Sequence, residues 1–290
     1  GIIIDDDCVY CDVSNNICIL NAQHGIVLAT TANHISVEGC VASLNGFHGI
    51  YLNGVFDSLI ADCLCQGNDA GDTGTYDGIH LDTTSERNNV TGNHCCGNDS
   101  YGIAVEDKQN NVMGNYVYNN AQHGISIAGA ECKITGNYVT DNGTETAGSY
   151  FGIFLSADAD RCQISDNYCS DTGGDTQSDG IYLTAGAVEI MINNNYCYNA
   201  YASAAAGNGI TLVGDNLDCQ IVGNHCNQND GDGIYVFNES DKCVVTGNKC
   251  MENGANGILI SESDYCAVTG NTCTANGADG IHVAGDATHV

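Results

Sequence analysis

The sequence predicts an all-β solenoid, in which short strands stack turn upon turn. Apolar residues alternate after each recurring Gly-Ile pair, as in Ile125 and Ile127, and this is the period of a half-buried strand. Units of about 22–29 residues with this pattern cannot bury their apolar face alone, so neighbouring units must stack. The pair returns twelve times, starting at residues 1, 25, 49, 78, 102, 124, 152, 180, 209, 233, 257 and 280.

Each unit carries its further elements in a fixed order. About ten to twelve residues after the glycine comes an aliphatic residue, often followed by x-Gly-Asn-x-Cys/Val, as in residues 134–139. A further asparagine, such as Asn142 or Asn253, closes most units. Leucine-rich repeats have similar lengths, but the sequence lacks their Leu-rich consensus. Several short strands per unit, separated by Gly, Asn and Asp turns, are therefore expected.

An asparagine ladder is expected at one register position of the stack. An asparagine in a turn tolerates a left-handed backbone, and its amide can bond to the same amide about 4.8 Å away on the next unit. The column reads Asn16, Cys40, Cys63, Asn93, Asn115, Asn137, Asn167, Asn195, Asn224, Asn248 and Asn271.

The eighteen cysteines fall mainly into two further columns, and we interpret them as buried free thiols. In frames such as 243–250, CVVTGNKC, the two cysteines appear together across the units barely more often than independent placement gives, and Ala or Val replaces the second. Free cysteine behaves as a small buried hydrophobe. Disulfides within some units are the alternative, favoured in an oxidising medium. Zinc is disfavoured because metal sites favour CxxC-type spacing together with histidine, and the recurring C-x6-C frame does not show that pattern.

The repeated GI-x-L…V-x-GN-x-C units resemble those of right-handed parallel β-helix proteins, the pectate-lyase-like superfamily. The resemblance implies one β-helix domain over residues 1–290, with about 11 complete rungs and a partial twelfth. It covers the whole chain but is compatible with lyases, hydrolases, epimerases, tailspikes and inert surface proteins. The chain starts at Gly1 and shows no amphipathic cap, so we expect a fragment of a longer chain or copies stacked end to end through open strand edges.

Charge excludes several partner classes. Six Lys and Arg against thirty-six Asp and Glu give a formal charge of −30, which repels nucleic acids and anionic membrane surfaces. No stretch is apolar for the ~18 residues of a membrane span. Because such a field attracts cations, calcium is the expected cofactor, if there is one. Its expected ligands are Asp69, Asp72 and Asp77.

Four units are lengthened at the same register, before the next Gly-Ile pair, at residues 68–77, 142–151, 171–179 and 199–208. Insertions at one register project from one edge of a solenoid, and the last three are expected to form a wall. Loops on a rigid scaffold are common binding sites. Drift in a tolerant turn is the alternative interpretation.

Beside that edge, the middle residue of each Gly-Ile strand is expected to face outward. In pectate-lyase-like proteins the glycan commonly lies along such a face, and the apolar side of a sugar can stack on aromatic rings. Strand propensity alone also favours aromatic residues here. The expected substrate-binding residues are Tyr51, Asp77, Tyr101, Phe154, Tyr182 and Tyr235.

The densest polar cluster surrounds the first inserted loop. Asp82 and Glu106 share a register on neighbouring rungs, which places their carboxylates roughly 5 Å apart. That separation suits a retaining glycosidase, and His80 on the same face can act as base or acid. Chance proximity among thirty-six acids is the alternative. The motifs of the related enzymes are absent: the chain has no proline for D-P-H-D, and neither N-T-D nor G-H-G occurs.

These observations predict an extracellular or virion-associated β-helix that engages polysaccharide along its Gly-Ile face and that could cleave it as a lyase or hydrolase. The alternative is a non-catalytic adhesive or fibre protein.

Overall fold

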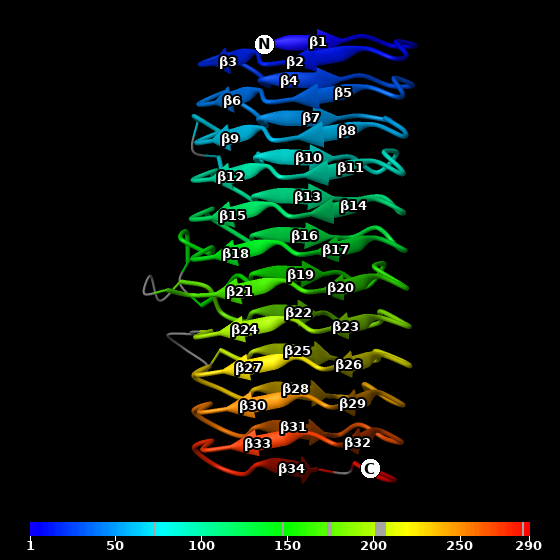
Figure 1. Ribbon diagram of the computed structural model, residues 1–290, viewed down its shortest axis with the longest axis vertical. Coiled ribbons are helices and arrows are strands. Elements are labelled where there is room, and N and C mark those ends of the chain that lie inside the picture. Colours follow the sequence, from blue (N-terminus) through cyan, green and yellow to red (C-terminus); the bar gives the residue numbers. More distant parts are fainter. Residues whose placement is uncertain (72, 147, 173–175, 201–206, 286) are drawn as a thin grey trace.

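The computed structural model describes all residues except 72, 147, 173–175, 201–206 and 286. Its strands form three parallel sheets that run the length of the molecule, and the two termini lie at opposite ends (Figure 1). The sheets contain 12, 11 and 11 strands, which confirms the predicted solenoid of 11 complete rungs and a partial twelfth. Among the described residues, no helix is long and apolar enough to cross a membrane.

Every rung contributes one strand to each sheet, in chain order. The first sheet holds the Gly-Ile strands: β1 (Ile2–Ile4), β4 (Ile26–Leu28), β7 (Ile50–Leu52), β10 (Ile79–Leu81), β13 (Ile103–Val105), β16 (Ile125–Ile127), β19 (Ile153–Leu155), β22 (Ile181–Leu183), β25 (Ile210–Val213), β28 (Ile234–Phe237), β31 (Ile258–Ser261) and β34 (Ile281–Ala284). The second sheet holds β2 (Asp12–Ser14), β5 (Ser36–Glu38), β8 (Leu59–Ala61), β11 (Asn89–Thr91), β14 (Asn111–Met113), β17 (Lys133–Thr135), β20 (Gln163–Ser165), β23 (Met191–Asn193), β26 (Gln220–Val222), β29 (Val244–Thr246) and β32 (Ala267–Thr269). The third sheet holds β3 (Ile17–Ile19), β6 (Val41–Ser43), β9 (Leu64–Gln66), β12 (His94–Cys96), β15 (Tyr116–Tyr118), β18 (Tyr138–Thr140), β21 (Tyr168–Ser170), β24 (Tyr196–Tyr198), β27 (His225–Asn227), β30 (Lys249–Met251) and β33 (Thr272–Thr274).

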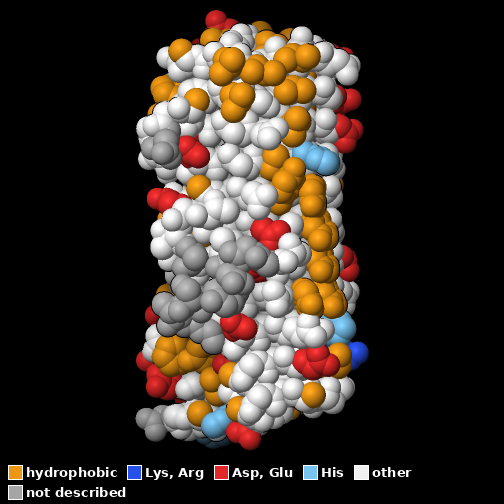
Figure 2. Space-filling view, turned by 90° about the vertical axis from the view of Figure 1, so that its left-hand side faces the viewer, with side chains coloured by type: hydrophobic (Ala, Val, Ile, Leu, Met, Phe, Trp, Pro, Cys, Tyr) orange, Lys and Arg blue, Asp and Glu red, His pale blue; other side chains and the backbone are white. Residues whose placement is uncertain are grey.

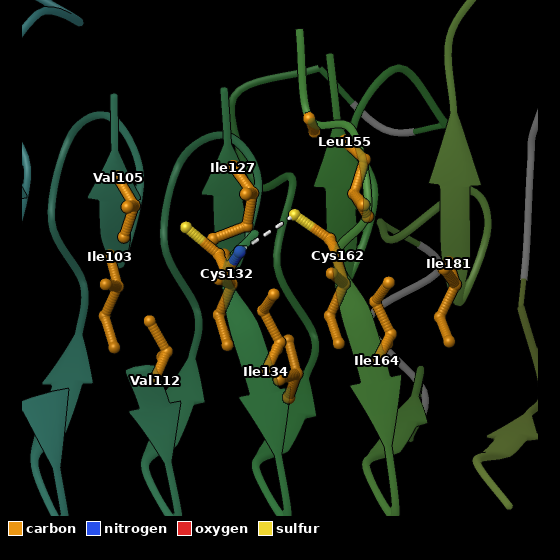
Figure 3. Packing of buried hydrophobic residues seen from close by; sticks show 14 of the residues in the cluster. Ile103, Val105, Val112, Ile127, Cys132, Ile134, Leu155, Cys162, Ile164 and Ile181 are labelled. Atoms are coloured by element: carbon orange, nitrogen blue, oxygen red, sulfur yellow. Dashed lines mark hydrogen bonds between the residues drawn. The ribbon is translucent and has the colours of Figure 1, made fainter. Parts of the chain in front are cut away.

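The register places like residues above one another. Ile79 pairs with Ile50 on one side and with Ile103 on the other, and His80 pairs with Tyr51 and Ala104. The first and third residues of these strands point into the core, where Ile79 and Leu81 are completely buried. Figure 3 shows such side chains packed rung upon rung inside the solenoid. Burial of this continuous column is the main stabilising term that a single unit lacks.

The asparagine ladder is present, with one correction to the expected backbone. The side-chain Nδ2 of Asn115 donates to Oδ1 of Asn137 at 3.0 Å and also to the carbonyl of Val90. The ladder asparagines do not adopt the left-handed conformation expected of them. That conformation belongs to the preceding residue. This residue is glycine at seven of the eleven rungs, with φ near 60–68° (Gly39, Gly92, Gly114, Gly136, Gly223, Gly247 and Gly270), and Asn or Asp at the other four (Asn15, Asp62, Asp166 and Asn194). Glycine adopts this conformation without steric cost, which explains the Gly-Asn order.

A second asparagine ladder runs beside the third sheet. Asn98 donates through Nδ2 to Oδ1 of Asn120 at 2.9 Å, and Asn120 donates in the same way to Asn142. The closing asparagines of the sequence units therefore belong to a second ladder. It satisfies backbone groups at the corner where the chain turns back toward the first sheet, because each amide also bonds a carbonyl such as Cys65 O.

All eighteen cysteines are free thiols in the structure, as the column analysis predicts. Fifteen are buried, and only Cys8, Cys11 and Cys273 are partly exposed. Within the core the backbone N–H of Cys132 donates to Sγ of Cys162 at 3.3 Å, the contact drawn in Figure 3. The thiols therefore pack as small core side chains, and thiols such as those of Cys63 and Cys162 accept weak hydrogen bonds from the backbone N–H of the preceding rung.

A row of stacked tyrosines covers the third sheet. The rings of Tyr138 and Tyr168 lie 4.7 Å apart at an interplanar angle of 7°, and those of Tyr168 and Tyr196 lie 5.2 Å apart at 6°. Tyr116 continues the row on the other side of Tyr138. Figure 2 shows the row as a vertical orange stripe near the right-hand edge, with a pale blue histidine at either end. Parallel rings at this separation cover one another's faces, so the row presents ring edges and hydroxyl groups to solvent.

Candidate functional site

The outer face of the first sheet is organised by the column of residues that precede the Gly-Ile pairs. Nδ1 of His48 accepts the backbone N–H of Asp77 at 2.8 Å, and Oδ1 of Asp77 accepts the N–H of Tyr101 at 2.9 Å. Other members of this acceptor column each take the N–H of the equivalent residue on the next rung in the same way: His123, Asp179, Asn208, Asp232 and Asn256. One role of Asp77 is therefore structural: like the other members of the column, it accepts a backbone hydrogen bond from the next rung.

Asp77 has a second role, because its other oxygen holds His80. Nδ1 of His80 lies 2.7 Å from Oδ2 of Asp77. An ionised carboxylate only accepts, so this bond places the proton of the imidazole on Nδ1. Nε2 of His80 then faces Oε1 of Glu106 at 3.6 Å. Asp77 at the end of the loop 68–77, His80 in β10 and Glu106 directly after β13 thus form a chain of acid, imidazole and acid.

Asp82 completes the cluster. The hydroxyl of Tyr51 donates to its Oδ2 at 2.6 Å, and the backbone N–H of Thr83 donates to its Oδ1 at 2.6 Å. A carboxylate oxygen of Asp82, one of Glu106 and a ring nitrogen of His80 lie within 4.8 Å of one another. The shared register of Asp82 and Glu106 therefore does bring their carboxylates together beside the imidazole.

The environments of the two acids push their pKa values apart. Burial acts to raise the pKa of Asp82, but the hydrogen bonds from Tyr51 and Thr83 outweigh it and hold that pKa below its ordinary value. Burial raises the pKa of Glu106; the charge of His80 opposes this shift, and the charges of Asp82 and Asp77 add to it. Asp82 therefore ionises at a lower pH than an ordinary aspartate, and Glu106 retains its proton to a higher pH than an ordinary glutamate.

The charge of His80 is stabilised in spite of its burial. Burial alone lowers the pKa of the imidazole, but the hydrogen bond to Asp77, aided by the charges of Glu106 and Asp82, raises it above the ordinary value. Nδ1 of the neighbouring His48 lies 3.6 Å from Oδ2 of Asp77 but accepts the backbone N–H of Asp77, so it donates no bond to the carboxylate, and burial lowers the pKa of His48 to about 2. Two stacked imidazoles, with ring centroids 4.4 Å apart, therefore have pKa values shifted in opposite directions.

The calcium ligands expected from the sequence are only partly described. Asp72 lies outside the described residues. Both oxygens of Asp77 are occupied by His80 and Tyr101, as given above. Oδ2 of Asp69 accepts hydrogen bonds from Thr73 and from the backbone of Thr75, whereas its Oδ1 is buried and has no hydrogen-bond partner among the described residues. The calcium site stays a prediction, and Asp69 is its best-placed described residue.

Aromatic rings continue the face toward the C-terminal end. Tyr101 stacks on His123, and His123 stacks on Phe154 with centroids 4.6 Å apart. Phe151 lies 4.1 Å from Tyr182 at an interplanar angle of 3°. These rings lie face to face along the solenoid axis, so the inner members offer mainly edges to a ligand. Tyr235, two rungs beyond Tyr182, stacks only on Phe237.

Several residues of this face are not among the middle residues of the Gly-Ile strands, which are the ones that the sequence predicts to face outward. His24, His48, His123 and Phe151 precede the Gly-Ile pairs, and their rings pack among those predicted to bind substrate. The signal was available, because five of the first six members of the acceptor column, from residue 24 to residue 151, are His, Tyr or Phe. A side chain just before a strand can turn onto the same face as the middle residue of that strand.

The inserted loops stand beside this face, on the side where Figure 1 shows chain projecting from the stack. Gln122 links two of them, because its Nε2 donates to the carbonyl of Gly74 at 3.1 Å and to Oε2 of Glu145 at 3.2 Å. Parts of the three later loops, residues 147, 173–175 and 201–206, lie outside the described residues, so the predicted wall is not tested along its length.

Comparisons with known proteins agree with this architecture. The A-module of the mannuronan C-5 epimerase AlgE4 from Azotobacter vinelandii superposes with a TM-score of 0.62 at 13% identity, over 96% of this chain and 89% of that one. The Dettilon tailspike protein gives 0.63 at 19% identity, over 89% and 62%. PfbA, a surface adhesin of Streptococcus pneumoniae, gives 0.56 at 12% identity, over 88% and 64%. This chain thus spans less than two thirds of the tailspike and adhesin chains.

At these identities the structural neighbours show the fold alone. No curated protein sequence matches this chain. The family model described as "Right handed beta helix region" matches residues 1–168 and 146–290, which together cover the whole chain. Together with the three parallel sheets, this match shows that the chain belongs to the right-handed β-helix family.

Proposed function

We propose that this protein binds a polysaccharide along the outer face of its first sheet and hydrolyses it at the cluster of His80, Asp82 and Glu106. The observation that carries the proposal is the opposed pKa shifts of two carboxylates whose oxygens lie within 4.8 Å of each other. Paired acids with separated pKa values are the common requirement of glycoside hydrolysis. The named activities of two structural neighbours, an epimerase of mannuronan and a tailspike described as enzymatically active, support a polysaccharide ligand.

In the proposed reaction Glu106 is the proton donor. Its raised pKa lets the carboxyl group keep its proton to a higher pH than an ordinary glutamate does, and Nε2 of His80 lies 3.6 Å from its Oε1. Transfer of the proton to the glycosidic oxygen accompanies cleavage of the bond between that oxygen and the anomeric carbon, and the positive charge that develops on the sugar faces ionised Asp82. Water then supplies the hydroxyl group to the anomeric carbon and returns a proton to Glu106.

His80 and Asp77 act on the donor rather than on the sugar. The bond from Nδ1 of His80 to Asp77 fixes the ring with Nε2 toward Glu106. Tyr51 fixes Asp82 in the same way, and burial together with its bond to Asp82 raises the pKa of Tyr51, so its phenol stays protonated. Both carboxylates thus have fixed positions before substrate arrives, which reduces the reorganisation needed during reaction.

The remainder of the binding face is proposed to consist of Tyr101, Phe154, Tyr182 and Tyr235. Because their rings stack on neighbours, sugars would contact ring edges and hydroxyl groups more than open ring faces. The neighbours described as tailspikes, a periplasmic epimerase and a surface adhesin support a location outside the cytoplasm or on a virion.

Incubation with a panel of neutral, amino and acidic polysaccharides tests the proposal, with chain length followed by size-exclusion chromatography. Shortened chains with new reducing ends and no absorbance of unsaturated products are expected. The double variant Asp82→Asn, Glu106→Gln should retain binding and lose cleavage. Cleavage that persists in the double variant would refute the assignment of these residues.

A second candidate function is adhesion without cleavage. The acceptor column favours adhesion, because the hydrogen bond from the backbone of Tyr101 is enough to explain why an acid stands at residue 77. Unchanged chains across the whole panel, together with measurable binding that Tyr182→Ala weakens, would support this function over hydrolysis.

Calcium is proposed at Asp69. Asp69 is only 1% exposed, and its Oδ1 has no hydrogen-bond partner among the described residues. A buried carboxylate oxygen without a donor suits a hard cation. Calorimetry should detect heat on calcium addition that Asp69→Asn abolishes, and the absence of heat with the unaltered protein would refute the site.

A further inference from the structure

The charge of the binding face restricts which glycan it can accept. Asp77, Asp82 and Glu106 surround one imidazole, so the cluster supplies more acids than bases. None of the twelve strands of the first sheet contains a lysine or arginine, and neither does the acceptor column before them. An anionic sugar at this position would meet carboxylates without a cationic side chain.

The six cationic side chains of the protein lie elsewhere, and all six are described. Arg87 bonds Asp57 at 2.8 Å, Lys108 pairs with Glu86 at 3.2 Å, and Arg161 pairs with Glu131 at 3.3 Å. The other three lie in the second sheet, in the third sheet or in a turn: Lys133, Lys249 and Lys242. Lys108 is only two residues from Glu106, yet its ammonium group pairs with Glu86.

We infer that the polysaccharide carries no carboxylate, sulfate or phosphate where it crosses β7, β10 and β13, and that its sugars there are neutral or bear amines. The inference rests on the proposed function, because it requires that this face bind glycan. A face lined by carboxylates attracts cationic ligands and repels anionic ones. The −30 formal charge of the chain adds to the repulsion of polyanions.

The inference also selects the reaction. Elimination across a glycosidic bond removes the proton beside a uronate carboxylate and leaves an unsaturated sugar. A sugar without that carboxylate offers no proton of comparable acidity. Hydrolysis, in which water is added across the bond that breaks, remains open to it, and the split pair Asp82 and Glu106 supplies the acid and the ionised carboxylate that it needs.

Matched polysaccharides test the inference. Polymannuronate is compared with its propylene glycol ester, and homogalacturonan with its methyl ester, so that only the charge of each backbone changes. Oligomers of N-acetylglucosamine and glucosamine form the neutral and cationic pair. Association constants are measured at low and high salt, in EDTA and in calcium. In EDTA and low salt the association constant of the ester is expected to be at least about tenfold larger than that of the acid. High salt should reduce the ratio of the two constants, because it screens the repulsion.

Two variants link the selectivity to the cluster. Asp82→Asn removes the charge of the ionised carboxylate from the site and should narrow the ratio of the ester and acid association constants. Glu38→Gln removes one charge from β5 in the second sheet and should leave the ratio unchanged. Its loss of charge is the same, so a general effect of net charge would appear in both variants.

The outcomes separate the two proposals. Acid forms that bind at least as tightly as their esters, in EDTA or in calcium, would overturn the inference while the proposed glycan binding stands. Binding of no member of the series would refute the proposed function and the inference with it. Selectivity that Glu38→Gln changes as much as Asp82→Asn would also overturn the inference.

Discussion

Oδ2 of Asp77 accepts the hydrogen bond of His80 Nδ1 over 2.7 Å, and this contact directs the opposite nitrogen of the ring toward Glu106. Asp77 reaches this position because its other oxygen is held by the backbone of the next rung, at Tyr101. A structural ladder and a candidate proton path thus share one side chain. Substitution of Asp77 should therefore disturb the candidate site through ring orientation.

Asp77→Asn is expected to reduce cleavage by lowering the pKa of His80. The amide can still accept from Tyr101, but it lacks the charge that raises the pKa of the imidazole. NMR titration of His80 should show a lower pKa in the variant, and the protein should remain folded. An unchanged pKa would contradict the contact. Asp62→Asn, a substitution in a turn of the second sheet, is the control and should leave the titration of His80 unaltered.

Glu106→Gln should lower the cleavage rate by about 10²–10⁴-fold, because the general acid is lost. Binding of a neutral oligosaccharide should be nearly unchanged, since the amide preserves shape. The rate and the binding constant are measured separately on the same oligomer. Equal losses in both would point to a structural role for Glu106 in place of proton donation.

Acid should destabilise the fold through its buried neutral histidines. Burial lowers the pKa of His48 to about 2 and that of His123 to about 3, whereas an unfolded histidine titrates near 6.5. Between these values the unfolded chain binds protons that the folded chain does not, so stability falls as pH falls below about 6.5. Each histidine contributes up to about 1.4 kcal/mol per pH unit.

His123→Asn should flatten this acid dependence. Asparagine at the same column position, as at Asn208, accepts the backbone N–H of the next rung, so the variant keeps the bond and loses the titration. Urea midpoints are compared from pH 7 to pH 4.5. His34→Asn, at an exposed position, is the control. Parallel curves for His123→Asn and the unaltered protein would contradict the assignment.

Loss of one ladder asparagine should be costly. Asn115→Ala removes bonds to Asn137 and to the carbonyl of Val90 and leaves buried groups unpaired. A decrease of about 2–4 kcal/mol in the free energy of unfolding is expected. Asn111→Ala breaks one outer bond, to Asn89, and should cost less than about 1 kcal/mol. Similar unfolding midpoints for the two variants would contradict the ladder's role.

Thiol labelling should distinguish the core cysteines from those at the ends. Only Cys8, Cys11 and Cys273 are partly exposed, so a thiol reagent should modify at most about these three under native conditions and all eighteen in denaturant. Mass spectrometry after labelling identifies the sites. Fast modification of a mid-solenoid thiol such as Cys197 would contradict its complete burial.

The fold could be predicted from the sequence because the repeat fixes the register. Once Gly78 and Gly102 are aligned, Asp82 and Glu106 must lie on neighbouring rungs, and the structure brings their carboxylates together. The contacts of His80 with Asp77 and of Asp82 with Tyr51 depend on side-chain rotamers, and periodicity does not determine rotamers. Columns also do not reveal which residue of a turn has a positive φ: the left-handed conformation belongs to the residue before each ladder position, most often glycine, and not to the ladder asparagine.

The ladder asparagines all donate in one direction. From Asn93 onward, each Nδ2 bonds the Oδ1 of the rung that follows, and at Asn271 the Nδ2 bonds only the carbonyl of Val245. Aligned amides of this kind polarise one another and add along the axis. The amide ladder therefore gives the two ends of the described solenoid different hydrogen-bonding groups, an unused acceptor at one end and an unused donor at the other. A rung that joins after Asn271 meets an amide ready to donate, whereas one that joins before Asn16 must supply the donor itself.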